Sequence, residues 1–241
     1  MSYYFKLNPE CPVCTSKIME LEEPRQLDCF YCHDTFITSH VCTRSHFVCD
    51  RCSNRDGWEI IKIYCESTME TNPMEMAQEI MTHMTIEDKS SHHHILVPAV
   101  LTAAIYNTLH KTDRKIEKLE KLFAEAVFEK KTHCNETGVC GAAASSGRII
   151  DIISDDIQVS EDKWKFSNYM AANAVYAIAD YMNTHCCKRD VLLSIKESVD
   201  YIAEHLKVYF MIDPNFTCKY PIPDGAECDD NCPFKYKKPT F

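Results

Sequence analysis

Residues 11–14 read CPVC, residues 29–32 read CFYC and residues 42–52 read CTRSHFVCDRC. These stretches hold eight residues of the kind that bind zinc: Cys11, Cys14, Cys29, Cys32, Cys42, His46, Cys49 and Cys52. Structural zinc takes four thiolate or imidazole ligands in a closed tetrahedron, and a Cys-x2-Cys turn places two sulfurs on one ion. The spacing therefore predicts a small zinc-ribbon-like module over residues 1–55 that holds two zinc ions and needs them to stay folded.

The eight ligands can be divided between two ions in two ways. A sequential arrangement gives the first four residues to one ion and the last four to the other, whereas an interleaved, cross-braced arrangement alternates the pairs. We favour the sequential arrangement, because the two residues between His46 and Cys49 suit ligands of one ion better than ligands of two. His33 and His40 are close enough in sequence to compete with His46 for its place.

The module has two interpretations beyond metal binding. It either serves only to hold itself folded, or it docks a partner or covers a site on the rest of the chain. Its apolar side chains would provide the contact surface in the second case; they are Phe30, Tyr31, Phe36 and Phe47.

The composition favours a protein that keeps its cysteines free. The chain has 241 residues, 15 of them cysteine, and a formal net charge of −10. In a reducing compartment cysteines serve metals or chemistry rather than disulfides, so we expect a soluble, cytoplasmic metal-binding protein. No apolar run reaches the ~18 residues of a membrane span. The negative charge argues against a general nucleic-acid binder, although a local basic patch stays open.

Beyond residue 52 the apolar residues recur at helical spacing, which predicts an all-α domain over residues 56–212. Pro73 lies where a proline in a first helical turn belongs. From residue 213 on, prolines and glycine replace the periodicity, so residues 213–241 are expected to form a tail. The seven expected helices cover residues 58–66, 74–84, 96–109, 113–130, 140–153, 162–182 and 189–206.

Three polar islands lie at or just before the starts of expected helices. They are residues 92–94 (HHH), residues 133–136 (HCNE) followed by Cys140, and residues 185–190 (HCCKRD). Packed helices can bring such ends into one pocket, where thiolates and imidazoles make a soft metal site. The predicted cofactor ligands are Cys134, Cys140 and one of the adjacent Cys186 and Cys187. The simpler alternative is that these cysteines are small buried hydrophobes and the histidines are solvated helix caps.

Three of the five glycines cluster with small residues at one of these islands. They are Gly138, Gly141 and Gly147, and residues 142–146 between them are alanine and serine. Such small side chains indicate that something approaches this helix closely. The approach is either tight helix packing or an anion or cluster sulfur received at the amino end of the helix.

The islands also carry two resemblances to known families. Residues 42–52, 93–101, 140–142 and 186–190 resemble an uncharacterised prokaryotic domain family that covers nearly the whole chain and is sometimes fused to methyltransferase domains. The second half is distantly similar to the alpha domain of iron–sulfur L-serine dehydratases. Pro98-Ala99-Val100-Leu101 matches that family's Pro-Ala-Val-Leu, Cys134-Asn135-Glu136 approximates its Cys-Gln-x-Glu, and residues 186–190 resemble its Cys-x-Lys-Arg-Asn.

The dehydratase resemblance implies a [4Fe–4S] cluster held in part by Cys134 and Cys186. In that family an open iron acts as a Lewis acid on the substrate hydroxyl. This chain departs from the pattern, since the family's remaining cluster cysteine falls near Val175, and a family cysteine is replaced by His94. Substitutes would be Cys140, Cys187 or a cysteine of the tail, where Cys218, Cys228 and Cys232 could complete the pocket or stay unused.

Lys188 and Arg189 stand at the start of an expected helix, where positive charge opposes the helix dipole. That misfit suggests that they hold an anion, with the Arg189 fork on a carboxylate. The alternative is a surface ion pair with Asp190 or Glu197, which would be worth under ~1 kcal/mol.

Three functional hypotheses follow. The first is an iron–sulfur-dependent lyase, of the dehydratase or desulfidase type, in which His94 or Glu136 removes a proton and Lys188 and Arg189 hold a small carboxylate substrate. The second is a non-catalytic metal or cluster carrier that docks with a methyltransferase-like partner through the zinc module. The third is a structural zinc protein without another metal.

Overall fold

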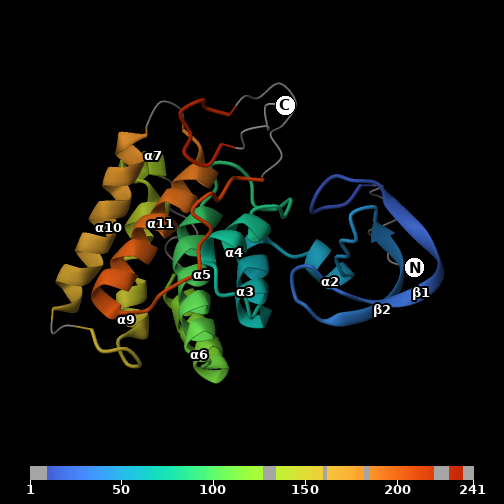
Figure 1. Ribbon diagram of the computed structural model, residues 1–241, viewed down its shortest axis with the longest axis horizontal. Helices are drawn as coiled ribbons and strands as arrows, with labels where there is room; N and C mark the ends of the chain where they lie inside the picture. The colour runs from blue at the N-terminus through green and yellow to red at the C-terminus, as the bar shows by residue number, and fades with distance from the viewer. Residues whose placement is uncertain (1–9, 127–133, 160–161, 182–184, 220–227, 236–241) are drawn as a thin grey trace.

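The computed structural model describes residues 10–126, 134–159, 162–181, 185–219 and 228–235. A small cysteine-rich module at one end of the molecule is followed by a larger helical bundle, as Figure 1 shows. The expectation of a mainly α protein is confirmed. None of the fifteen cysteines, all of which are among the described residues, forms a disulfide. Among the described helices, none has the length and apolar character required to cross a membrane.

The module is built on one antiparallel hairpin. Strand β1 (Ile18–Asp28) pairs with strand β2 (Thr35–Cys42), with Ile18 opposite Cys42 at the open end and Asp28 opposite Thr35 at the turn. The register shifts between Glu20 and Arg25, in a stretch that contains Pro24, which has no N–H to donate to the ladder. After β2 the chain runs back toward the turn and forms the short helix α2 (Asp50–Ser53).

The helical bundle begins directly after the module. Helix α3 (Gly57–Ser67) starts at a capping box, in which Asp56 accepts from the N–H of Glu59 and the Glu59 side chain accepts from the N–H of Asp56. Helix α4 (Pro73–Ile80) has Pro73 in its first turn, as expected, and Asn72 as its cap. Helix α5 (His92–Thr108) is buried on all sides from His93 to Asn107 and lies in the middle of the bundle.

The remaining helices complete the bundle. They are α6 (Thr112–Glu125), α7 (Cys134–Thr137), α8 (Gly141–Ser146), α9 (Ile149–Ile153), α10 (Lys163–Asp180) and α11 (Cys187–Leu206). Helix α10 lies on the outside of the bundle against α8, α9 and α11. Each of the seven expected helices has a counterpart, but the one over residues 140–153 is interrupted between α8 and α9. Gly147 lies at this break, and a Cβ there would be 2.3 Å from the backbone oxygen of Ser167 in α10. The expected ends at residues 130 and 182 lie outside the described residues.

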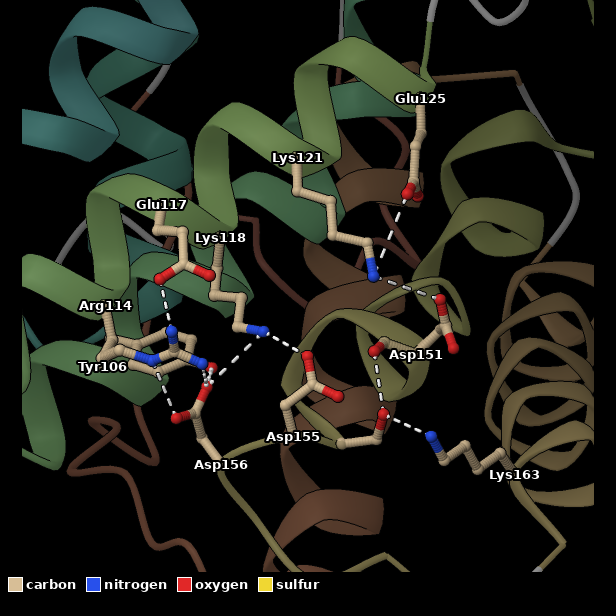
Figure 2. Close-up of polar contacts among 11 residues, drawn as sticks. Tyr106, Arg114, Glu117, Lys118, Lys121, Glu125, Asp151, Asp155, Asp156 and Lys163 are labelled. Carbon is tan, nitrogen blue, oxygen red and sulfur yellow. Dashed lines mark hydrogen bonds and ion pairs between the residues drawn. The ribbon is translucent and has the colours of Figure 1, made fainter.

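Two sets of contacts stabilise the bundle: ion pairs after α9 and the packing of the tail. Arg114, Lys118 and Tyr106 bind the adjacent carboxylates Asp155 and Asp156 just after α9, as Figure 2 shows. The described parts of the tail also pack against the bundle: Phe216 and Phe234 are buried with their rings 6.1 Å apart, and the Lys219 N–H donates to Gln78 Oε1 of α4 at 2.7 Å. The boundaries 1–55, 56–212 and 213–241 stay predictions.

Candidate metal centres

The eight predicted zinc ligands form two compact groups. The outer group consists of Cys11, Cys14, Cys42 and His46, and the inner group consists of Cys29, Cys32, Cys49 and Cys52. Within each group the ligand atoms lie within 4.8 Å of one another. Cys14 and Cys42 have sulfurs 3.8 Å apart, and those of Cys32 and Cys49 are 3.9 Å apart. A tetrahedron with metal–sulfur bonds of ~2.3 Å has edges of about 3.8 Å, so both groups have the size of a single-ion site.

This division corrects the sequential pairing, which is wrong. The hairpin decides the pairing, because antiparallel strands bring the residues before β1 next to the residues after β2. Ile18 pairs with Cys42, so the first Cys-x2-Cys pair lies beside Cys42 and His46. The returning chain then places Cys49 and Cys52 beside the second Cys-x2-Cys pair at the turn. The short loop between His46 and Cys49 is therefore a link between two sites. His33 and His40 are outside both groups.

Backbone donors prepare both groups for anionic sulfur. The N–H groups of Arg44 and His46 each lie 3.3 Å from the Cys42 sulfur, and the Cys49 N–H lies 3.4 Å from the Cys29 sulfur. Hydrogen bonds from Cys49 and Cys52 lower the pKa of Cys29, whereas burial raises the pKa of Cys32 to about 12. A divalent cation bound in either group would hold its cysteine sulfurs as thiolates.

The inner group is also the point where the module meets the helical bundle. His83, just beyond α4, donates from Nε2 to the Cys52 carbonyl at 3.1 Å. The Tyr31 hydroxyl lies 3.1 Å from the Thr82 hydroxyl, and Ser67 donates to the Tyr31 carbonyl at 3.3 Å. Tyr31 is fully buried, so the inner group lies against the bundle.

A cavity of about 460 Å³ lies where the three polar islands of the helical domain meet. It is lined by Lys89, Ser90, Ser91, His93, His94, Cys134, Glu136, Cys140, Ala142, His185 and Cys187. Five predicted site residues are in this lining: His94, Glu136, Cys134, Cys140 and Cys187. Cys186, Lys188 and Arg189 are not among the lining residues. His133 lies outside the described residues.

Cys134 is the most strongly activated residue of the cavity. Its sulfur lies 3.3 Å from His94 Nε2 and accepts from the Gly141 N–H at 3.2 Å. Hydrogen bonds from Cys140 and then His94 lower the pKa of Cys134, which favours its thiolate form. A Cβ at Gly141 would meet the His94 ring at 2.3 Å, which explains why glycine opens α8. The groups that closely approach the start of α8, as its small residues predicted, are the Cys134 sulfur and the His94 ring.

The other two cavity cysteines are thiols in the absence of a cation. The hydrogen bond to Cys134 and burial raise the pKa of Cys140, and burial raises the pKa of Cys187 to about 11. His185 Nε2 lies 3.5 Å from the Cys187 sulfur. Among the described residues, only the outer and inner groups place three or more ligand atoms within 4.8 Å, so the cavity donors are spaced more widely than a closed single-ion site.

Lys188 and Arg189 are buried and matched with carboxylates. Lys188 Nζ lies 2.5 Å from Asp88 Oδ1, and Arg189 binds Asp190 Oδ1 through Nε at 3.2 Å and a terminal nitrogen at 3.1 Å. The second terminal nitrogen of Arg189 lies 3.8 Å from Asp229 Oδ2 in the tail. Each of the two residues is only 3% exposed, so the expected surface pair is wrong in its location although Asp190 is a partner. Their role toward a substrate stays a prediction.

Two of the tail cysteines, Cys228 and Cys232, lie near Cys186, and no tail cysteine is in the cavity lining. Cys186 is exposed and caps α11, with the Arg189 N–H 3.5 Å from its sulfur. Burial raises the pKa of Cys232 to about 11, and the charges of Cys228 and Cys186 add to the effect. Of the adjacent pair, Cys187 is therefore the residue that faces the cavity, and Cys186 belongs with the tail.

His93 lines the cavity although it was not among the predicted site residues. His93 is 2% exposed, and its Nδ1 lies 3.0 Å from the Ser90 carbonyl oxygen. Its Nε2 is buried without a hydrogen-bond partner among the described residues. Periodicity could have separated the three adjacent histidines, because neighbours on a helix point about 100° apart.

The chain belongs to a protein family of unknown function (DUF5714), whose model matches residues 61–235, more than half of the chain. No curated protein sequence and no solved structure matches the chain. The match agrees with the expected uncharacterised family. It includes the cavity and most of the tail but not the two N-terminal ligand groups.

Proposed function

We propose that this protein binds two structural zinc ions in its N-terminal module and a third, soft metal centre in the cavity of the helical domain. The proposal depends on one observation: Cys134, Cys140 and Cys187, from two separate parts of the chain, line the same open cavity. Thiolates and imidazoles are the ligands that zinc, copper(I) and iron–sulfur clusters prefer. Wide spacing of the donors suits a cluster, or an ion that keeps a position free, better than a closed structural ion.

Cys65 shows what a cysteine without such a role looks like in this protein. Its side chain is fully buried in the apolar core, and burial raises the pKa of its thiol. Cys134 differs in each respect, because it is partly exposed and is approached by an imidazole and a backbone N–H. The simpler interpretation of the cavity cysteines as small hydrophobes therefore fits Cys65 and does not fit Cys134.

The narrower proposal is an iron–sulfur-dependent lyase acting on a small anionic substrate, and its support is the family resemblance together with the open cavity. A bound cluster would supply a Lewis acid for the leaving group. Glu136 lines the cavity and would accept the proton. Lys89 is the cation of the lining and would attract the substrate anion, while Lys188 and Arg189 would keep the start of α11 in place through Asp88 and Asp190.

Anaerobic purification followed by metal and sulfide analysis tests this function. The wild type should hold about two zinc ions together with iron and acid-labile sulfide, and should absorb visible light as iron–sulfur proteins do. Cys134→Ser should lose the iron and keep the zinc. Cys65→Ala serves as the matched control, a cysteine outside the cavity, and should keep both. Colourless wild-type protein with only two zinc ions, unable to take up a third metal, would refute the proposal.

Catalysis needs a separate test once the centre is established. Glu136→Gln retains the shape of the side chain but not its basicity, so it should keep the metal and lose turnover of a substrate found by screening small hydroxy and thiol acids. Equal turnover by Glu136→Gln would remove Glu136 from the mechanism. The alternative of a non-catalytic carrier for a methyltransferase-like partner stays a prediction.

A further inference from the structure

His93 carries a buried nitrogen that nothing in the described protein satisfies. A carbonyl oxygen can only accept, so the contact with Ser90 at 3.0 Å requires that Nδ1 carries the hydrogen. Burial lowers the pKa of His93 to about 4, so the ring is neutral at physiological pH and Nε2 is a bare acceptor. A buried polar atom without a partner is destabilising, and a folded protein tolerates it when something else binds there.

The neighbouring His94 has the opposite arrangement. Its Nε2 lies 3.3 Å from the Cys134 sulfur, which accepts from the Gly141 N–H and, as a metal ligand, would be a thiolate that accepts from His94 as well. His94 therefore directs a proton toward Cys134, whereas His93, which lines the same cavity, keeps a lone pair on Nε2 without a partner among the described residues. A backbone carbonyl on Nδ1 and a free Nε2 are the arrangement of histidines that ligate metals, because the carbonyl fixes the tautomer and the orientation of the ring.

We infer that His93 is a nitrogen ligand of the metal centre in the cavity, binding through Nε2, and that His94 is not a ligand but a hydrogen-bond donor to the Cys134 sulfur. This inference rests on the proposed third metal centre. It gives the cavity a mixed nitrogen and sulfur donor set in place of one made of cysteine alone. A neutral imidazole adds a donor without adding negative charge beside the cysteines.

The test is a Co²⁺ titration of the full chain after its N-terminal groups have been loaded with zinc. Co²⁺ bound to thiolate and imidazole gives charge-transfer and d–d absorption that reports the donor set. His93→Asn keeps an amide donor at the position of Nδ1, for the Ser90 carbonyl, and removes Nε2. His92→Asn is the matched control, since His92 is on the same turn, contacts Ser90 Oγ at 3.0 Å and is not among the cavity-lining residues.

His93→Asn should weaken Co²⁺ binding by about tenfold or more and shift the d–d bands, while His92→Asn should match the wild type. Wild-type affinity and bands in His93→Asn, together with loss of binding in Cys134→Ser, would overturn the inference and leave the metal centre standing. No cavity binding by the wild type would overturn both.

If His93→Asn does not fold, His93→Gln decides the question. Its longer side chain places an amide where Nε2 lies, so a folded His93→Gln protein should bind Co²⁺ more weakly and with altered bands. Unchanged bands in that variant would also overturn the inference.

Discussion

The contact between the inner metal group and the helical bundle predicts that the two zinc ions differ in what they stabilise. Replacing Cys52 by serine removes one ligand of the inner group, and replacing Cys14 by serine removes one of the outer group. With only three ligands left, each variant should release about one zinc ion. Structural zinc contributes roughly 10–16 kcal/mol to the folding of small zinc-finger peptides, which exceeds the free energy of unfolding of many domains.

The difference between the variants follows from the interface. Loss of the inner ion frees Tyr31 and the Cys52 carbonyl from the contacts with Ser67, Thr82 and His83. Three hydrogen bonds at about 1 kcal/mol each and one buried aromatic ring at about 2 kcal/mol give a loss of about 5 kcal/mol for the bundle in Cys52→Ser. Cys14→Ser should leave these contacts in place.

Thermal unfolding followed by the helical circular dichroism signal measures this loss. At roughly 2–4 °C per kcal/mol, Cys52→Ser should lower the midpoint by about 10 °C or more, and Cys14→Ser by a few degrees at most. Hydrogen exchange should rise over residues 64–83 in Cys52→Ser alone. Equal midpoints for the two variants, with each lacking one zinc ion, would refute the reasoning and show that the bundle does not depend on the inner group.

Three further changes test other parts of the structure. Gly141→Ala forces a Cβ against the buried His94 ring, so it should cost about 1–3 kcal/mol in urea unfolding and weaken Co²⁺ binding in the cavity; an unchanged protein would mean that the ring moves freely. Hydrogen bonds from Arg114 hold the pKa of Asp156 at about 2, below its ordinary 3.8, so Asp156→Asn should cost about 2 kcal/mol above pH 5. Because the folded-state pKa is the lower one, that difference should shrink as the pH falls from about 4 toward 2, and a difference that grows on acidification would contradict it. Arg189→Lys loses the fork that binds Asp190 and faces the tail, so limited proteolysis should cut the tail faster while the zinc content stays the same; an equally resistant tail would show that the fork does not hold it.

The chain sequence determined the local features. Cys-x2-Cys spacing is a property of a few consecutive residues, so it was enough to identify the eight ligands and the number of N-terminal metal groups. Helical periodicity and the first-turn Pro73 likewise depend on neighbours along the chain, and each expected helix has a counterpart. The placement of the polar islands at helix starts indicated that their cysteines could meet, as Cys134, Cys140 and Cys187 do in the cavity.

Only the tertiary structure decided which of these residues are partners. The hairpin register interleaved the two metal groups, because strand pairing brings together residues that the chain keeps far apart. Asp88, one hundred residues before Lys188, supplies the carboxylate that pairs with the buried lysine. A pattern of neighbouring residues cannot predict a partner so far away in the chain. The same is true of His93 and His94, which are neighbours of the same type: packing buries the Nε2 of His93 without a partner among the described residues and places the Nε2 of His94 beside the Cys134 sulfur.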